Sequence, residues 1–208
     1  MRRLPQGAAR RVTWVAGGAV LLALAVLGAA CAVLSVRVQG ASMQPNLANG
    51  DRVLLRPFTG GDLPHRLALV VGRFEENGPR VVKRVIGLPG DRVQIHEDGH
   101  GHVQVEVQPG GAGDWQQVDN PSWRGADWAE GSACCTGDGK ATDAATPVVV
   151  PAGMLFLLGD NVSSSRDSLS LGWAPADLIQ GVVGWRVWPL GDLGRPNTHV
   201  RLIAATAD

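Results

Sequence analysis

One stretch near the N-terminus limits the possible folds of this chain more than any other feature. Residues Val12 to Val36 include no charged side chain, whereas four arginines precede them and Arg37 follows. As a helix with a rise of about 1.5 Å per residue, the stretch would be roughly 37 Å long, which exceeds a hydrocarbon core of about 30 Å. Because basic flanks tend to stay in the cytoplasm, we expect residues 1–36 to form a cytoplasmic tail and a transmembrane anchor. Residues 37–208 would then form one domain outside the plasma membrane.

Two cleavable leaders are the alternatives to an anchor. The stretch is rich in alanine and ends in small residues, as a signal peptide does, but its apolar run is longer than the usual core of about 7–15 residues. A lipoprotein signal ending at Cys31 would need a large aliphatic residue where Gly28 stands. No second apolar run of similar length follows, so a single span is predicted.

Beyond residue 37, short runs of Val, Leu and Ile alternate with turns rich in Gly, Pro and Asp, which predicts a mainly β domain. The segment 97–147 has a different composition and is predicted to be a loop-rich insertion. A helical turn is expected at Ala174–Ile179. The predicted strands are Arg52–Leu55, Leu67–Arg73, Arg80–Ile86, Asp91–His96, His102–Gln108, Val148–Val150, Met154–Leu158 and Val182–Trp188.

The overall composition gives no support for nucleic acid as a partner and does not settle how the cysteines pair. Nineteen basic and nineteen acidic side chains give a formal net charge of zero, so nothing favours nucleic acid as a partner. Three cysteines do not indicate a disulfide framework. Cys134 and Cys135 are adjacent, and a bond between them, other pairings and buried thiols all remain possible at this point.

Three polar segments are the candidates for chemistry. Ser42 lies in a Ser-Met-x-Pro turn just after the predicted anchor, which alone is typical of an ordinary turn. Lys83 shares a strand face with Val81 and Val85, and burial there would lower its pKa toward that of a general base. The alternative is a solvent-facing lysine, since both faces of that strand carry aliphatic residues. The third segment, residues 159–168, follows the predicted strand Met154–Leu158 and includes several serines and aspartates.

In this order, the segments resemble the type I signal peptidase family. The Ser42 turn resembles its nucleophile segment, residues 50–54 its next strand, and residues 83–91 (Lys-Arg-Val-Ile-Gly-Leu-Pro-Gly-Asp) its lysine segment. Gly-Asp-Asn at 159–161, followed by Ser-x-Asp-Ser at 165–168, resembles its last segment. The resemblance covers the anchor and about residues 38–95 and 150–190, but not the insertion.

The resemblance implies a serine endopeptidase that removes signal peptides from secreted preproteins beside the lipid bilayer, without metal or cofactor. Ser42 would be the nucleophile and Lys83 the general base. Ser165 matches the serine that orients the lysine amine, and Asp167 matches a supporting acid. The Ser42 amide would be one oxyanion donor, and Gly40 stands where some members provide the second.

Several positions depart from the family pattern or carry less specific expectations. Asn46 stands where the family usually has threonine, and Val162 and Leu169 replace basic residues, so Asp167 is expected to lack an ionic partner. We expect the last segment to be altered while the dyad survives. Met43 is expected to line a shallow substrate pocket.

Other readings remain as alternatives. The first is a maturation protease of the same family dedicated to one substrate, and the second is an anchored binding domain without activity. A self-cleaving Ser/Lys regulator would require an N-terminal DNA-binding segment, and this chain has its apolar stretch at that place. The histidines and acidic residues at 96–102 fit a solvated hairpin tip better than a metal site.

Overall fold

The computed structural model describes residues 18–26, 28–30, 33–58, 62–97, 100, 102–128, 133–142, 145–196 and 199–205. Its strands are β1 (Val36–Arg37), β2 (Arg52–Pro57), β3 (Leu69–Gly72), β4 (Val81–Gly87), β5 (Arg92–Glu97), β6 (Val103–Gln108), β7 (Gln116–Asp119), β8 (Ala133–Cys134), β9 (Ala141–Thr142), β10 (Val148–Val149), β11 (Met154–Leu158), β12 (Ala174–Pro175), β13 (Ile179–Trp188) and β14 (Arg201–Ala204). Its short helices are α2 (Ser168–Leu171), η1 (Pro109–Gly111), η2 (Pro121–Trp123), η3 (Val162–Ser164), η4 (Ala176–Leu178) and η5 (Leu190–Asp192).

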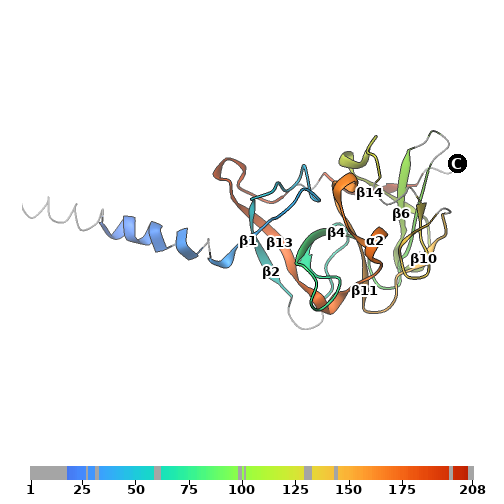
Figure 1. The fold of residues 1–208 in the computed structure, drawn as a ribbon, viewed down its shortest axis with the longest axis horizontal. Coiled ribbons are helices and arrows are strands. Elements are labelled where there is room, and N and C mark those ends of the chain that lie inside the picture. The colour runs from blue at the N-terminus through green and yellow to red at the C-terminus, as the bar shows by residue number, and fades with distance from the viewer. Residues whose placement is uncertain are drawn as a thin grey trace, which may run out of the picture.

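The strands form two antiparallel sheets. The first sheet has the strand order β1-β2-β13-β3-β4-β11-β12. The second sheet has the order β14-β7-β6-β5-β8-β9, and β10 also pairs with β5. Figure 1 shows β1, β2 and β13 at one end of the domain and β6 and β10 at the other. The second sheet uses strands from both sides of the predicted insertion, because β5 precedes it and β14 lies near the C-terminus.

A tight turn joins the two sheets between β4 and β5. Asp91 is 2% exposed, and its carboxylate accepts hydrogen bonds from the Leu88 amide at 2.7 Å and the Gly110 amide at 2.8 Å. It also pairs with the Arg66 guanidinium at 2.8 Å. The Leu-Pro-Gly-Asp sequence at 88–91 therefore fixes how the first sheet leads into the second.

The largest apolar cluster of the described residues lies between the sheets. Ile86 of β4 and Phe156 of β11 pack there with Ile95, Val105 and Val107 of the second sheet, and all five are at most 1% exposed. Burial of such side chains contributes roughly 1.5–3 kcal/mol each. The two sheets thus share one core.

Most predicted strands are confirmed. Met154–Leu158 has the predicted bounds, and the hairpin after residue 91 forms as β5 and β6, with its tip at 98, 99 and 101 outside the described residues. The predicted turn at Ala174–Ile179 is a two-residue strand followed by a 3-10 turn. Trp173 packs against the main cluster, whereas Trp185 is 52% exposed beyond a bulge in β13.

The predicted anchor is only partly described. Helical backbone covers residues 18–26, 28–30 and 33–34, and it projects from the domain beside β1 (Figure 1). Within the described part of the chain, no helix has both the length and the apolar character needed to cross a bilayer. Residues 12–17, 27 and 31–32 of the predicted span lie outside the described residues, and so does Cys31.

Candidate active site

The Ser42 turn is held against the segment that follows β11. The Ser42 carbonyl oxygen accepts a hydrogen bond from the Asn161 amide at 3.0 Å, and the Ala41 carbonyl accepts one from the Asn161 side chain at 3.2 Å. Within the turn, the Leu47 amide donates to the Met43 carbonyl at 2.8 Å. These bonds fix the backbone that presents Ser42, whose side chain is half-buried.

Gly159 is the point where Ser42 and Ser165 come together. A side-chain carbon at Gly159 would lie 2.6 Å from the Ser42 carbonyl oxygen and would also collide with the Ser165 side chain. Only glycine leaves this space, so the first residue of the Gly-Asp-Asn motif has a steric role. The structure therefore brings the first and last polar segments of the sequence into contact.

Lys83 is buried in the middle of β4. Its strand pairs with β3 on one side, where Lys83 faces Val70, and with β11 on the other, and the residue is 2% exposed. This burial excludes the solvent-facing alternative. It lowers the pKa of Lys83 from 10.5 to about 8, against the opposing negative charges of Asp167 and Asp160. An amine with this pKa is partly neutral near physiological pH and can accept a proton.

Ser165 and Asp167 form a buried hydrogen-bonded pair. The Ser165 hydroxyl donates to the Asp167 carboxylate at 2.5 Å, and the Gly159 amide donates to the same oxygen at 2.8 Å. The other carboxylate oxygen accepts from the Leu169 amide at 3.2 Å and so caps α2. Burial raises the pKa of Asp167, while these hydrogen bonds and the Lys83 charge oppose it.

Asp160 is the centre of a second buried network. It is 0% exposed and takes both Nε and Nη2 of Arg84, each at 2.7 Å. The Asn46 side chain donates to it at 2.6 Å, and the Asn120 side chain at 3.0 Å. Asn46, a departure from the family pattern, therefore connects the Ser42 turn to the carboxylate beside Gly159.

The insertion contacts this network directly. Besides Asn120, Trp123 donates its indole N–H to the Gly159 carbonyl oxygen at 3.0 Å, and Trp123 is 6% exposed. Asn120 also accepts from the Ser122 amide at 3.0 Å, which fixes the start of η2. The backbone amide of Gly159 thus bonds to Asp167, while its carbonyl bonds to the insertion.

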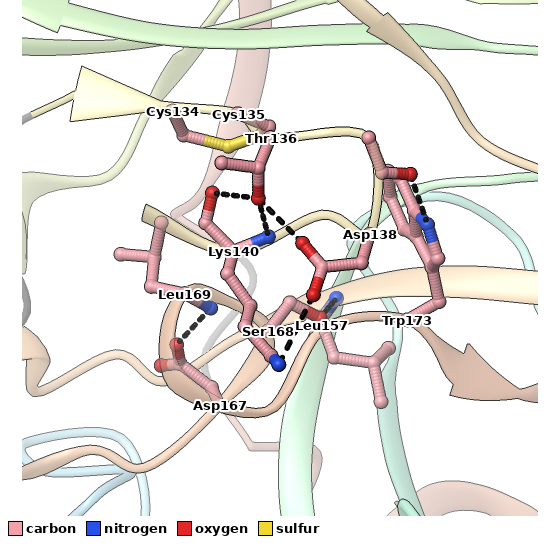
Figure 2. The surroundings of a disulfide bond; sticks show 11 residues. Cys134, Cys135, Thr136, Asp138, Lys140, Leu157, Asp167, Ser168, Leu169 and Trp173 are labelled. Atoms are coloured by element: carbon pink, nitrogen blue, oxygen red, sulfur yellow. Dashed lines mark hydrogen bonds and ion pairs between the residues drawn. A yellow bond between two sulfur atoms is a disulfide. The ribbon is translucent and has the colours of Figure 1, made fainter. Parts of the chain in front are cut away.

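The apolar departures Val162 and Leu169 are also explained by the insertion. Both are 5% exposed and lie in the main core cluster with Cys134 and Cys135. Those cysteines form a disulfide with each other, which decides among the alternatives left open by the sequence. Figure 2 shows the disulfide beside Leu169. Apolar residues suit these two positions because the insertion covers them.

A turn of the insertion packs on the segment after α2. The Trp173 indole donates to the Gly137 carbonyl at 3.3 Å (Figure 2). Gly139 has a φ of +84°, and a side-chain carbon there would lie 2.8 Å from the Trp173 ring. The close approach requires glycine, so the turn at 136–140 is shaped to fit Trp173.

The two remaining predicted site residues are Gly40 and Met43. The Gly40 amide donates to the Asn49 side chain at 3.2 Å, and Gly40 has a φ of +86°. Met43 is 1% exposed and packs in an apolar cluster with Leu47 and Val53, and its predicted place in a substrate pocket stays a prediction.

At the hairpin tip, the described residues provide no metal-binding cluster of three or more His, Cys, Asp or Glu. His96 lies 3.9 Å from Glu106, and the rings of His100 and His102 are 6.4 Å apart. Asp98 lies outside the described residues.

Sequence reasoning named the Gly-Asp-Asn motif but missed what Asp160 does. The position of Arg84 could have indicated a buried acidic partner, because Arg84 follows Lys83 and therefore points to the opposite face of β4. Nothing in the sequence indicated the contacts of Asn120 and Trp123, because 40 and 36 residues separate them from Asp160 and Gly159.

Comparisons with known proteins identify the family. The model of the family described as "Signal peptidase, peptidase S26" matches residues 11–188. Signal peptidase I of Bacillus caldolyticus is 31% identical over 169 residues, which cover 77% of this chain and 87% of that protein. Signal peptidase IB of Staphylococcus aureus is 30% identical over 187 residues, which cover 86% and 90%.

A solved signal peptidase I structure from Enterococcus faecalis covers 59% of this chain and 97% of its own, with 24% identity and a TM-score of 0.40. That overlap is too low to carry an argument. The family match and the relatives confirm the resemblance inferred from the sequence motifs. This chain belongs to the signal peptidase family, peptidase S26, and is a serine peptidase.

Proposed function

We propose that the protein is a membrane-anchored endopeptidase that removes N-terminal signal peptides from preproteins, with Ser42 as nucleophile and Lys83 as general base. The main support is the burial of Lys83 in β4, which lowers its pKa to about 8. Gly159 adds to this, because it packs against both the Ser42 backbone and the Ser165 side chain.

In the proposed mechanism, Ser42 Oγ attacks the scissile carbonyl carbon and its proton passes to neutral Lys83 Nζ. A Ser-Lys pair is a known variant of the nucleophile-base arrangement. Collapse of the tetrahedral intermediate transfers the Lys83 proton to the leaving amine and leaves an ester on Ser42. Lys83 then takes a proton from water as the oxygen attacks the ester carbonyl. Collapse of this second intermediate breaks the bond to Ser42 Oγ, which takes the proton back from Lys83 as the acyl part leaves with a free carboxyl group.

The supporting residues have distinct roles in this proposal. The Ser42 amide donates to the oxyanion, an interaction worth roughly 3–4 kcal/mol per donor. Ser165 orients the Lys83 amine, and Asp167 holds Ser165 through their 2.5 Å hydrogen bond. The Gly40 amide would be the second donor, and for this it would exchange its hydrogen bond to the Asn49 side chain for one to the oxyanion.

The anchor and its orientation are part of the same proposal. The charge-free residues 12–36, with arginines before them, would hold the N-terminus in the cytoplasm and the domain outside. Ser42 would then lie a few residues from the bilayer, where the apolar part of a signal peptide is still embedded.

The test is cleavage of a preprotein with an Ala-x-Ala site in detergent micelles. Wild type should cut after the last alanine, and Ser42→Ala should not. Absence of cleavage by folded wild type on a panel of preproteins would contradict a general signal peptidase and favour an enzyme dedicated to one substrate. Full activity in Ser42→Ala or Lys83→Met would contradict the dyad.

A further inference from the structure

A basic groove lies on the first sheet, along the chain that leads into the Ser42 turn. It has a volume of about 390 Å³ and is formed by the chain before the Ser42 turn and by the β3–β4 hairpin. Gln39 lines it two residues after β1, and Val82 lines it one residue before Lys83. The complete lining is Ser35, Val36, Arg37, Gln39, Arg73, Arg80 and Val82.

The charged residues that line this groove are all basic. Three arginines line it and no acidic residue does. The Nε of Arg73 is buried and is without a hydrogen-bond partner among the described residues. Within the same residues, the ion pairs involve other cations, and Arg37, Arg73 and Arg80 are in none of them. Three guanidinium groups in one groove without an acidic partner favour a ligand that brings a carboxylate or another anionic acceptor.

The position of the groove points to the peptide substrate as that ligand. β1 is an end strand of the first sheet and pairs only with β2 among the described strands, so its second edge is available to an extended peptide. Arg37 and Gln39 precede Ser42 by five and three residues. For a peptide that runs beside this segment with its scissile bond at Ser42, the residue next to Arg37 would be about four to six residues from that bond.

We propose that this groove binds the carboxylate of an Asp or Glu of the substrate, about four to six residues from the scissile bond. Arg73 and Arg80 would hold it from the β3–β4 hairpin, and Arg37 from β1. This inference rests on the proposed function, because it takes Ser42 as the point of cleavage. It adds a selection among substrates by charge.

Binding to the Ser42→Ala variant tests this without requiring cleavage. Fluorescein-labelled peptides with an Ala-x-Ala site would carry Glu or Gln at one position, four to six residues before or after the site. Fluorescence anisotropy in neutral detergent gives the two dissociation constants. We expect the Glu peptide to bind at least fivefold more tightly at one of these positions, and added salt should reduce the difference.

Three arginine variants of Ser42→Ala locate the effect. Arg73→Gln and Arg80→Gln should each bring the Glu/Gln affinity ratio close to one. Arg56→Gln is the matched control, because Arg56 is an exposed arginine of β2 outside the groove, and it should keep the wild-type ratio. The Glu/Gln affinity ratio within each variant cancels any loss of affinity that affects both peptides equally.

Two results would overturn the proposal. One is equal affinity for Glu and Gln peptides at every position, and the other is a Glu preference that Arg73→Gln and Arg80→Gln both retain. If, instead of a peptide preference, Arg73→Gln weakens binding to vesicles of anionic phospholipid, the groove binds lipid headgroups and the proposal is wrong. Cleavage by wild type in the same detergent reports separately on the proposed function.

Discussion

Two pairs of basic side chains, one pair at each sheet, differ in burial. In the first sheet, Lys83 and Arg84 are buried side by side on β4, and both are 2% exposed. In the second sheet, Asp119 pairs with Arg124 and Arg201, whose side chains are 71% and 72% exposed. Buried charges are costly and are kept where they are paired or used, whereas exposed pairs contribute little.

In the proposed mechanism the first sheet carries the chemistry, and the second sheet supports it. The support is nevertheless direct, since Asn120 and Trp123 reach from the insertion to Asp160 and Gly159. The comparison therefore predicts large functional effects on the first sheet. It predicts moderate effects where the sheets meet and negligible ones on the outer face of the second sheet.

The largest effect is expected from the proposed dyad. Ser42→Ala removes the nucleophile and Lys83→Met removes the base, so each should lower kcat at least about a thousandfold. Both should leave the melting temperature near or above that of wild type, because Met at position 83 relieves the burial of a charge. Single-turnover cleavage and calorimetry check the two parts. A Lys83→Met variant that keeps a tenth of the activity would show that another group is the base.

The next effect should come from Asp160. Asp160→Ala leaves Arg84 buried without its carboxylate, which should lower the free energy of unfolding by about 3–5 kcal/mol. Arg201→Ala breaks an exposed pair of the second sheet and should change that free energy by less than about 0.5 kcal/mol. Urea unfolding followed by tryptophan fluorescence measures both. Equal losses would mean that burial does not separate the two sheets as described.

The sequence predicted the parts of the molecule that depend on short-range patterns. Alternating aliphatic residues identified most strands, and the Lys-Arg-Val-Ile-Gly-Leu-Pro-Gly-Asp run at 83–91 identified the family. The sequence could not show that Lys83 is buried, because both faces of β4 carry aliphatic residues. In the structure both faces are covered, since Lys83 and Arg84 are each 2% exposed.

Long-range partners were beyond such patterns as well. Val162 and Leu169 looked like losses from the family pattern when read alone, yet they fill a core that the insertion completes. The role of Asn120 depends on a contact across 40 residues, and an isolated Asn-Pro pair predicts only a turn.

A moderate effect is expected where the sheets meet. Asn120→Ala removes one of the donors to Asp160 and leaves that buried oxygen less satisfied, so the free energy of unfolding should fall by about 1–2 kcal/mol. The control is Asn77→Ala, an exposed asparagine in the turn between β3 and β4. Urea unfolding distinguishes them, and a loss as small as that of the control would show that the insertion does not support Asp160.

The smallest effect is a shift in pH dependence, and it tests the chemistry of the first sheet most finely. Because the pKa of Lys83 is lowered to about 8, its neutral form increases with pH, and kcat/KM should increase about fivefold from pH 7 to pH 8 before levelling. The negative charge of Asp167 opposes the lowering, so Asp167→Asn should move the midpoint to a lower pH. The amide oxygen of Asn can still accept the Ser165 hydroxyl and the Gly159 amide, whereas its NH2 group loses the hydrogen bond from the Leu169 amide. A midpoint that moves to higher pH in Asp167→Asn would mean that Lys83 is not the group whose ionisation controls the rate.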